Sequence, residues 1–268
     1  MHFRRSTVGL LAGLFLAGSI AAGASAAASA RPAASGPAFR VLVFSKTAAF
    51  RHASIPAAIA AVEKLGSEHN FAVDATEDDT VFNDANLSRY QAVVFLLTTG
   101  DVLNTTEQGA FQRYIEHGGG FMGVHSASDT FHNWAWYGGL VGAYFVDHPS
   151  PQQATVDVEG TSTAATAPLP NKWVRTDEWY NFNINPRPNV RVLATVDEKT
   201  YNPVGFSGHS MGADHPIAWC HPYDGGRSFY TAMGHTSESY SEPLYLQHLL
   251  GGIDMAAGQA PFNCNPDS

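Results

Sequence analysis

Short apolar segments that alternate with helix-like segments dominate the first half of the chain. Residues 39–44, 71–76, 91–97 and 121–125 each have the length of a strand, and residues 91–97 are apolar on both faces. A strand with two apolar faces needs cover on both sides, and strands that alternate with helices pair in parallel. We therefore predict an α/β fold with a doubly wound, mostly parallel sheet in three layers.

Start signals of helices lie between these strands. Ser54, followed by Pro56 in the first turn, predicts the start of one helix. Thr105 and Gln108 have the spacing of a capping box and predict the start of another helix, which the glycines at 118–120 end. These signals support the β-α-β order that a doubly wound sheet requires.

The second half of the chain is less regular. Long connections at residues 161–172 and 200–216 separate its strand-like segments. Connections of that length in a compact domain are usually functional or mobile. Further strands are expected at residues 154–158, 190–196, 217–220 and 228–233, and a last helix is expected from Ser241 onward.

The first thirty residues have the pattern of a secretory signal peptide. Arg4 and Arg5 form a positive head, residues 8–20 are apolar, and small residues in A-x-A spacing follow. These thirteen apolar residues are too few to span a membrane, which needs roughly 20. We expect the leader to be cleaved and the mature protein to be secreted, without membrane contact. The expected organisation is a signal peptide at 1–30, a linker at 31–37, one α/β domain at 38–257 and a C-terminal tail at 258–268.

Charge and cysteine content exclude some classes of protein. The 15 basic residues are outnumbered by 24 acidic residues and form no cluster, whereas nucleic-acid binding rests on clustered Lys and Arg. We therefore expect no nucleic-acid partner. Cys220 and Cys264 are the only cysteines, and export would allow them to form a disulfide. Two unpaired thiols are the alternative.

Polar side chains follow the predicted parallel strands at their carboxyl ends, where open parallel sheets bind ligands. Lys46 follows the first strand, and His125 follows the fourth at a strand-to-helix turn. Hydrolases and amidotransferases mount a nucleophile at such a turn, but here the residue is an imidazole, which excludes cysteine acyl transfer. His125 is then a metal ligand, a general base or a group that binds substrate. The alternative is a histidine that only donates to a backbone carbonyl at the strand end.

Histidines and aromatic residues are frequent in the predicted loops. Flat rings such as those of Trp134 and Tyr180 stack on the apolar face of a sugar, while acidic side chains and histidines bond its hydroxyl groups. The alternative is that these aromatic residues belong to the core. The residues predicted to bind substrate are Lys46, Trp134, His148, Tyr180 and Asp214, and His221 is also expected near the pocket.

Six ordered segments between residues 39 and 258 carry a further signal. Among them are VLVFSKTAAFRHASIPAAI, GGGFMGVHSASDT, RTDEWYNF and GADHPIAWCHPYDGGRSFYTAMGHT. Together they resemble the ThuA-like (trehalose utilisation) family, which is similar in fold to the class I glutamine amidotransferases but lacks their catalytic cysteine. The resemblance implies a flavodoxin-like sheet and a role in sugar catabolism, in particular through 3-keto sugars made by partner dehydrogenases.

The resemblance also implies one pocket that is associated with a metal ion. Carried over by motif, its ligands are His125, Glu178 of the Asp-Glu segment and His235 of the Gly-His segment. Two imidazoles and a carboxylate are a common set for Zn²⁺, so the expected cofactor is a divalent cation, with zinc first, and no nucleotide. The candidate bases are Asp177, His52 and His215.

These residues and the resemblance together predict an exported enzyme that acts on carbohydrates. A ketone at C3 of a sugar makes the proton on C2 acidic, so that a base can remove it and the oxygen on C1 can leave. We expect cleavage of a glycosidic bond in a disaccharide or a 3-keto glycoside, by a hydrolase or a lyase, with a sugar as the ligand. The alternative is a carbohydrate-binding protein without catalysis. Nothing in the sequence predicts an oligomer.

Overall fold

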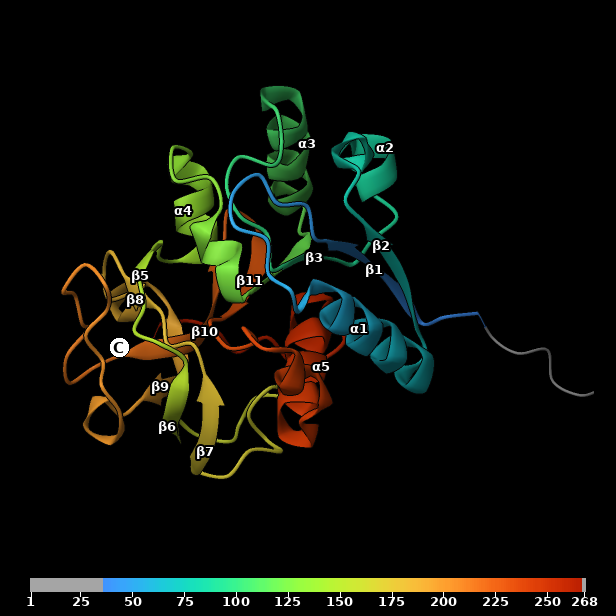
Figure 1. Cartoon of the computed structure of the whole chain (residues 1–268). Coiled ribbons are helices and arrows are strands. Elements are labelled where there is room, and N and C mark those ends of the chain that lie inside the picture. Colours follow the sequence, from blue (N-terminus) through green and yellow to red (C-terminus); the bar gives the residue numbers. More distant parts are fainter. Residues whose placement is uncertain (1–35, 267–268) are drawn as a thin grey trace, which may run out of the picture. The chain divides into compact units, whose positions relative to one another are not determined.

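A nine-stranded mixed sheet forms the centre of the molecule (Figure 1), in a computed structural model that describes residues 36–266. The strand order is β2-β1-β3-β4-β11-β10-β9-β6-β7. The first five strands in this order are parallel, and the remaining four extend the sheet in antiparallel fashion. The bounds are β1 (Phe39–Phe44), β2 (Phe71–Thr76), β3 (Ala92–Leu96), β4 (Gly120–Val124), β6 (Gln152–Val158), β7 (Lys172–Asp177), β9 (Arg191–Val196), β10 (Pro216–Tyr223) and β11 (Gly226–Thr231). A separate two-stranded sheet pairs β5 (Phe145–Asp147) with β8 (Asn181–Phe182).

Helices cover both faces of the large sheet. Figure 1 shows α1 (Ile55–His69) and α5 (Pro243–Ala256) on one face, and α2 (Asp84–Leu87), α3 (Thr105–Glu116) and α4 (Ala135–Val141) on the other. The predicted α/β fold with a mostly parallel core is therefore confirmed. Short 3-10 helices complete the chain: η1 (Asp79–Val81), η2 (His125–Asp129), η3 (Arg187–Asn189), η4 (Glu198–Thr200) and η5 (Ser237–Ser241).

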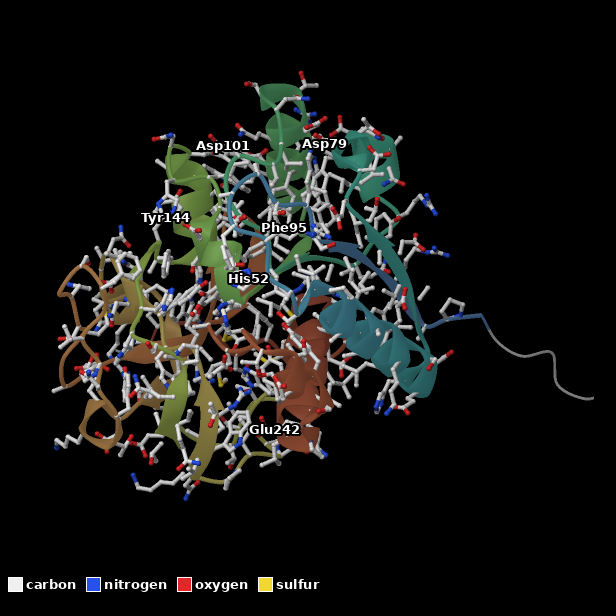
Figure 2. All side chains as sticks on the ribbon, viewed as in Figure 1. His52, Asp79, Phe95, Asp101, Tyr144 and Glu242 are labelled. Carbon is white, nitrogen blue, oxygen red and sulfur yellow. A yellow bond between two sulfur atoms is a disulfide. The ribbon has the colours of Figure 1, made fainter. Side chains whose placement is uncertain are left out.

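The parallel strands are buried on both faces, as their apolar sequence requires. Phe95 in β3 packs against Phe44, Phe82, Phe111 and Phe121, with ring centroids 5.2 to 5.9 Å apart. Each ring of this size removes a large apolar area from water, so the cluster joins β1, β3 and β4 to α3 (Figure 2). The loops that follow these strands therefore start from fixed positions.

The start of α3 differs from the prediction by one residue. The Asn104 side chain accepts hydrogen bonds from the backbone N–H groups of Thr106 and Glu107, at 2.9 and 3.1 Å. The Glu107 carboxylate in turn accepts from the backbone N–H of Asn104 at 2.8 Å. The capping box predicted for Thr105 and Gln108 is therefore wrong, because Asn104 and Glu107 offer the same spacing one position earlier.

Ser54 precedes α1, as predicted, but its side chain does not cap the helix. The Ser54 hydroxyl instead donates to the backbone carbonyl oxygen of His235, at 2.7 Å. The serine therefore joins the first turn of α1 to the loop that follows β11.

One long strand of the second half was not predicted. Along β7, alternate residues are buried, and the buried side chains are those of Trp173, Arg175 and Asp177. Arg175 and Asp177 pair with each other at 3.2 Å, which allows both charges to lie inside. Because a buried ion pair stands where apolar residues would be expected, the sequence of β7 lacks the alternation that marks a strand.

Cys220 of β10 and Cys264 form a disulfide, so the pairing favoured by the sequence is confirmed. The bond joins the segment after α5 to the sheet, across 44 residues of chain. Within residues 36–266, no helix is both long enough and apolar enough to cross a membrane. The predicted signal peptide at 1–30 lies outside the described residues.

Candidate functional site

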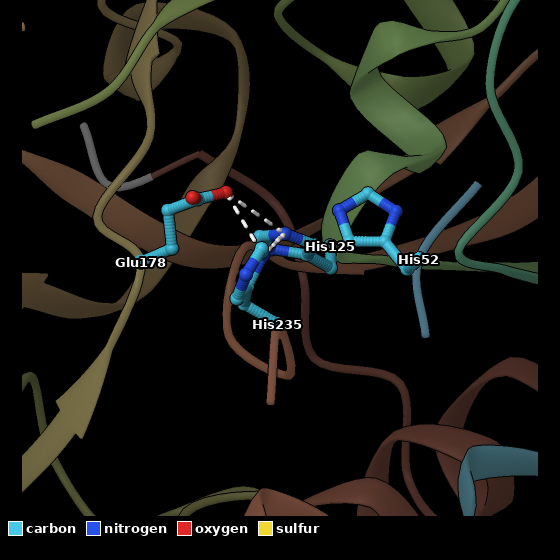
Figure 3. Close-up of side chains that lie close together, drawn as sticks. All are labelled: His52, His125, Glu178 and His235. Carbon is cyan, nitrogen blue, oxygen red and sulfur yellow. Dashed lines mark hydrogen bonds and ion pairs between the residues drawn. The ribbon is translucent and has the colours of Figure 1, made fainter. Parts of the chain in front are cut away.

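Four side chains that can hold a metal ion meet at one edge of the large sheet (Figure 3). His52 lies in the loop after β1, His125 is the first residue after β4, Glu178 follows β7 and His235 lies in the loop after β11. Four antiparallel pairings separate β7 from β11, so the two strands run in the same direction. All four residues therefore follow the carboxyl ends of strands, where the sequence predicted a ligand site, although the position of Glu178 after β7 was not predicted.

Three of these residues bring ligand atoms to mutual distances that suit one ion. His125 Nε2 lies 3.2 Å from His235 Nδ1 and 3.5 Å from Glu178 Oε2, and His235 Nδ1 lies 3.0 Å from Glu178 Oε2. Ligand atoms about 2.0–2.1 Å from a tetrahedral zinc ion are roughly 3.3 Å apart. With His52 included, the four ligand atoms lie within 4.8 Å of one another. The group can therefore hold a metal ion, with His52 as its most distant member.

The orientation of His125 is fixed by the backbone around it. His125 Nδ1 lies 2.6 Å from the carbonyl oxygen of Ala232, which can only accept, so Nδ1 carries the proton and Nε2 is free to bind a cation. His125 has a φ of +50°, a conformation that L residues adopt rarely and mostly at functional sites. Its own carbonyl accepts from the Tyr230 hydroxyl at 2.7 Å. The bond to a backbone carbonyl thus does not exclude a functional role, because it turns the other nitrogen toward Glu178.

Glu178 is ionised in this setting. Burial alone would raise the pKa of its carboxyl group, but the adjacent rings of His125 and His235 lower it to about 2. Glu178 Oε2 and the unprotonated Nε2 of His125 are both acceptors, so they face each other without repulsion only if positive charge lies between them. A proton on His235 Nδ1, which lies within 3.2 Å of both atoms, can bridge them, and a cation in the same place would do so too.

The two remaining histidines of the group differ in charge. Burial lowers the pKa of His235, but the hydrogen bond to Glu178 and the charges of Glu178 and Asp177 outweigh it and raise this pKa above its usual value. Burial lowers the pKa of His52 to about 3, and the nearby rings of His125 and His235 add smaller contributions in the same direction. His52 is therefore neutral and available as a ligand or a base.

Asp177 holds two of the ligands in place. Its carboxylate accepts hydrogen bonds from the backbone N–H groups of Glu178 (2.9 Å), Gly234 (2.8 Å) and His235 (3.0 Å). The Asp177 carboxylate also forms an ion pair with the guanidinium of Arg175. This guanidinium lies over the rings of Trp173 and Tyr245, 4.7 and 4.6 Å from their centroids. Both oxygens of the fully buried Asp177 are thus occupied, so the structure supports a positioning role and argues against the predicted role as a base.

A pocket of about 460 Å³ opens above this group, and we call it the site pocket. Tyr180 stacks on His125 and on Phe145, with centroid distances of 4.2 Å in both cases. The sequence predicted His148 and Tyr180 in this pocket, and both line it. Residues of the pocket that the sequence did not identify are Phe50, Asp129, Phe145, Pro151 and Phe206.

Asp129 is the second carboxylate of the site pocket, and its position was readable in part from the sequence. It ends the short helix η2 that starts at His125. The carboxylate pairs with His132 Nε2 at 2.8 Å and stays partly exposed. The only signal in the sequence that Asp129 lies near the site is its position four residues after His125.

Three residues predicted to bind substrate lie outside the site pocket. Lys46 pairs with Asp79, which Figure 2 places beside α2 and away from His52. The Trp134 ring stacks on Trp136, at a centroid distance of 4.9 Å, so the alternative of a packing role holds for this residue. Asp214 forms an ion pair with Arg187 at 2.6 Å.

Two predicted histidines also have structural partners. His215 bonds Glu198 through Nδ1 at 3.0 Å and the carbonyl oxygen of Tyr180 through Nε2 at 2.8 Å. His221 lies in β10 with its Nε2 bonded to the carbonyl of Gly139 at 2.9 Å. Neither ring lines the site pocket. His215 therefore has no free nitrogen to act as a base, but it fixes the backbone that carries Tyr180.

Comparison with known proteins agrees with this architecture. Residues 40–256 match the ThuA family, described as trehalose utilisation. A crystal structure of a ThuA-like protein from Bacteroides uniformis is 25% identical, with a TM-score of 0.68 over 84% of this chain and 95% of that one. A ThuA-like protein from Parabacteroides merdae has a TM-score of 0.67 at 18% identity, over 84% of this chain and 91% of that chain. A β-galactosidase from Bacillus circulans has a TM-score of 0.51 at 12% identity, over 81% of this chain and 31% of its own, and shares only the fold. Among curated proteins, no sequence matches significantly.

Proposed function

Because the chain belongs to the ThuA (trehalose utilisation) family, we propose that it is an enzyme that cleaves a glycosidic bond of a disaccharide or a 3-keto glycoside. The site would use a divalent cation held by His125, Glu178 and His235. One observation carries this proposal: three ligand atoms, 3.0 to 3.5 Å apart, converge below a pocket with aromatic walls.

The donor set supports zinc as the cation. Two imidazoles and one carboxylate form a catalytic zinc set that leaves a position open for water or substrate. The free Nε2 of His125 and the ionised Glu178 are ready to bind without losing a proton, whereas His235, whose pKa is raised, must be deprotonated at Nδ1, so metal binding should weaken as the pH falls. When bound, the cation would polarise the carbonyl oxygen of a sugar ketone.

The walls of the site pocket suit a sugar. Phe145 and the exposed Phe206 offer apolar surface for one side of a pyranose ring, while His148 and Asp129 are placed to bond hydroxyl groups. Phe50 is 65% exposed at the rim, where a bound ring would cover it.

Removal of the proton on C2 needs a base that is free and faces the pocket. Asp177 and His215 have no free atom, which leaves His52 of the sequence candidates and adds Asp129. We favour Asp129, because its carboxylate is held by His132 and is partly exposed to the pocket. The base takes the C2 proton, the electron pair of that bond forms the C1–C2 double bond, and the C1–oxygen bond breaks. The leaving oxygen takes the proton that the base removed, and water then adds to the double bond, with its hydroxyl group on C1 and a proton on C2, to complete a hydrolysis.

Secretion is a second part of the proposal. The signal-peptide pattern of residues 1–30 supports it, and so does the Cys220–Cys264 disulfide, because disulfides persist in oxidising compartments. N-terminal sequencing of the protein from the growth medium tests it. A mature N-terminus close to residue 30 is expected, and retention of Met1 inside the cell would contradict export.

Turnover of sugars by the metal-loaded protein tests the catalytic proposal. Purified protein would be assayed with trehalose, other disaccharides and their 3-keto forms, beside the variant Glu178→Ala and the control His117→Ala, whose exposed ring lies at the end of α3. We expect cleavage that is lost in Glu178→Ala and kept in the control. Sugar binding without turnover would instead indicate a carbohydrate-binding protein.

A further inference from the structure

A second pocket adjoins the site pocket. It has a volume of about 540 Å³, and we call it the outer pocket. The two pockets share three wall residues, His148, Pro151 and Phe206. The two pockets are therefore neighbours, separated by the side chains of these three residues.

The lining of the outer pocket combines apolar and polar groups. Val204 is 50% exposed and Phe206 is 73% exposed, although both are large apolar residues. Gln152 and Asn202 belong to the same lining, where the Gln152 side-chain amide donates to the backbone oxygen of Asn202 and accepts from its backbone nitrogen, at 3.0 Å each. Exposed apolar surface beside a rigid polar edge is the pattern that a sugar ring matches, because the ring has an apolar face and hydroxyl groups at its edge.

His148 lies between the metal-binding group and the outer pocket. Its Nδ1 is 3.1 Å from Glu178 Oε1, on the site side. Its ring meets Phe206 edge to face, with centroids 5.6 Å apart. A ligand that spans both pockets would cross the wall that His148 forms with Pro151 and Phe206, and His148 brings this wall next to Glu178. The bond to be cleaved would lie at that point.

We propose that the outer pocket binds the second ring of a two-ring sugar, the ring that leaves when the glycosidic bond breaks. This inference rests on the proposed function and adds a site and a substrate class to it. The outer pocket then distinguishes disaccharides from glycosides whose leaving group is small.

Filling the outer pocket tests the proposal. Val204→Trp places a bulky ring in the outer pocket at a half-exposed loop position, and Ile184→Trp, at a site 48% exposed and outside both pockets, is the matched control. Calorimetry would compare trehalose, cellobiose and lactose with the methyl glycosides of their non-reducing rings. We expect one disaccharide to bind the wild type at least about tenfold more tightly than its methyl glycoside. Val204→Trp should remove this difference without weakening the methyl glycoside, and Ile184→Trp should retain it.

The same proteins, assayed for cleavage of the disaccharides and their 3-keto forms, distinguish the two proposals. The proposal for the outer pocket would be overturned, even if cleavage occurs, by equal affinities of the wild type for disaccharide and methyl glycoside. It would also be overturned if Val204→Trp kept the preference for the disaccharide. Two further results would overturn this proposal: tighter binding of a 4-nitrophenyl glycoside than of every disaccharide, and no binding of any of these sugars. A disaccharide preference that Val204→Trp removes, without any cleavage, would support the outer pocket and contradict the enzyme.

Discussion

Asp177 Oδ1 lies 3.0 Å from the backbone nitrogen of His235, across 58 positions of sequence. Asp177 ends β7 in the antiparallel half of the sheet, whereas His235 follows β11 in the parallel half. The same oxygen also accepts from the backbone N–H of Glu178. One carboxylate therefore fixes the distance between Glu178 and His235, so that the group that could hold a metal ion joins the two halves of the fold.

Replacing Asp177 by Asn should weaken metal binding. The amide keeps one acceptor, but it loses the charge that offsets Arg175 and turns a donor toward the backbone N–H groups. We expect the metal affinity to fall by about 10 to 100-fold, as for other groups that orient ligands. Chelator competition measures this. Asp157→Asn, which alters only an exposed pair with Lys172, is the control, and equal affinities in both variants would contradict the assigned role.

Asp177→Asn should also lower stability. Arg175 is buried and would be left without its buried partner, although Glu242 at 3.1 Å compensates in part. Breaking a buried pair costs about 3–5 kcal/mol, and we expect the lower end of this range. Urea unfolding measures the change, and a loss as small as that of Asp157→Asn would refute the prediction.

Asp129→Asn should separate catalysis from metal binding. If Asp129 is the base, kcat should fall by about 100-fold or more, because general acid–base catalysis typically contributes that much. Metal content should stay unchanged, since Asp129 is not one of the ligands. Asp101→Asn, an exposed acidic residue in the loop after β3, serves as the control (Figure 2). A kcat within a few-fold of the wild type would transfer the role of base to His52.

Acid should destabilise the metal-free protein through His248. Burial lowers the pKa of His248 to about 4, although its bond to Ala165 opposes this, whereas the unfolded residue has a pKa near 6.5. The unfolded chain therefore binds a proton that the folded chain refuses, so stability is complete above pH 6.5 and falls as the pH drops toward 4. The contribution of this one residue is about 3 kcal/mol.

Urea unfolding between pH 7.5 and 4.5 measures the effect of His248. His248→Asn can keep the hydrogen bond to the Ala165 carbonyl but does not titrate, so its stability should depend less on pH than that of the wild type. His69→Asn, at an exposed position on α1, should follow the wild type. Parallel curves for all three proteins would rule out this source of acid sensitivity.

Loss of the disulfide should lower stability without emptying the site. Cys220 and Cys264 close a loop across 44 residues, for which the chain-entropy estimate is about 4 kcal/mol. The double variant Cys220→Ala/Cys264→Ala should therefore unfold at lower urea than the oxidised wild type. Neither cysteine belongs to the group that could hold the metal, so metal stoichiometry should be unchanged, and a loss of metal in the double variant would contradict this prediction.

The parallel half of the fold was predictable from the sequence because burial on both faces leaves a continuous apolar signal, as in β3. The antiparallel half was less predictable for a physical reason. Its strand β7 buries Arg175 and Asp177 as a pair, so charge stands where the alternation rule expects apolar residues. Burial of that pair depends on contacts with Tyr245 and Glu242, which lie about seventy residues away in the chain.

The candidate site was predictable in its ligands and less so in its walls. His125 was predictable from its turn at a strand end, whereas Glu178 and His235 were identified by the family motifs that contain them. Phe206 enters the site pocket only through the folding of a loop, and no local pattern marks it. His215 shows the converse, because its place in a long polar loop favoured a functional role while the structure uses both nitrogens to hold Tyr180.

Titration of the metal-free protein with Zn²⁺, followed by calorimetry, tests the central claim most directly. One ion should bind per chain, and His125→Ala, Glu178→Ala and His235→Ala should each weaken binding by at least about 100-fold while retaining a folded circular dichroism spectrum. His117→Ala should bind as the wild type does. A wild type that binds no Zn²⁺, or three ligand variants that bind it as tightly as the wild type, would contradict the account.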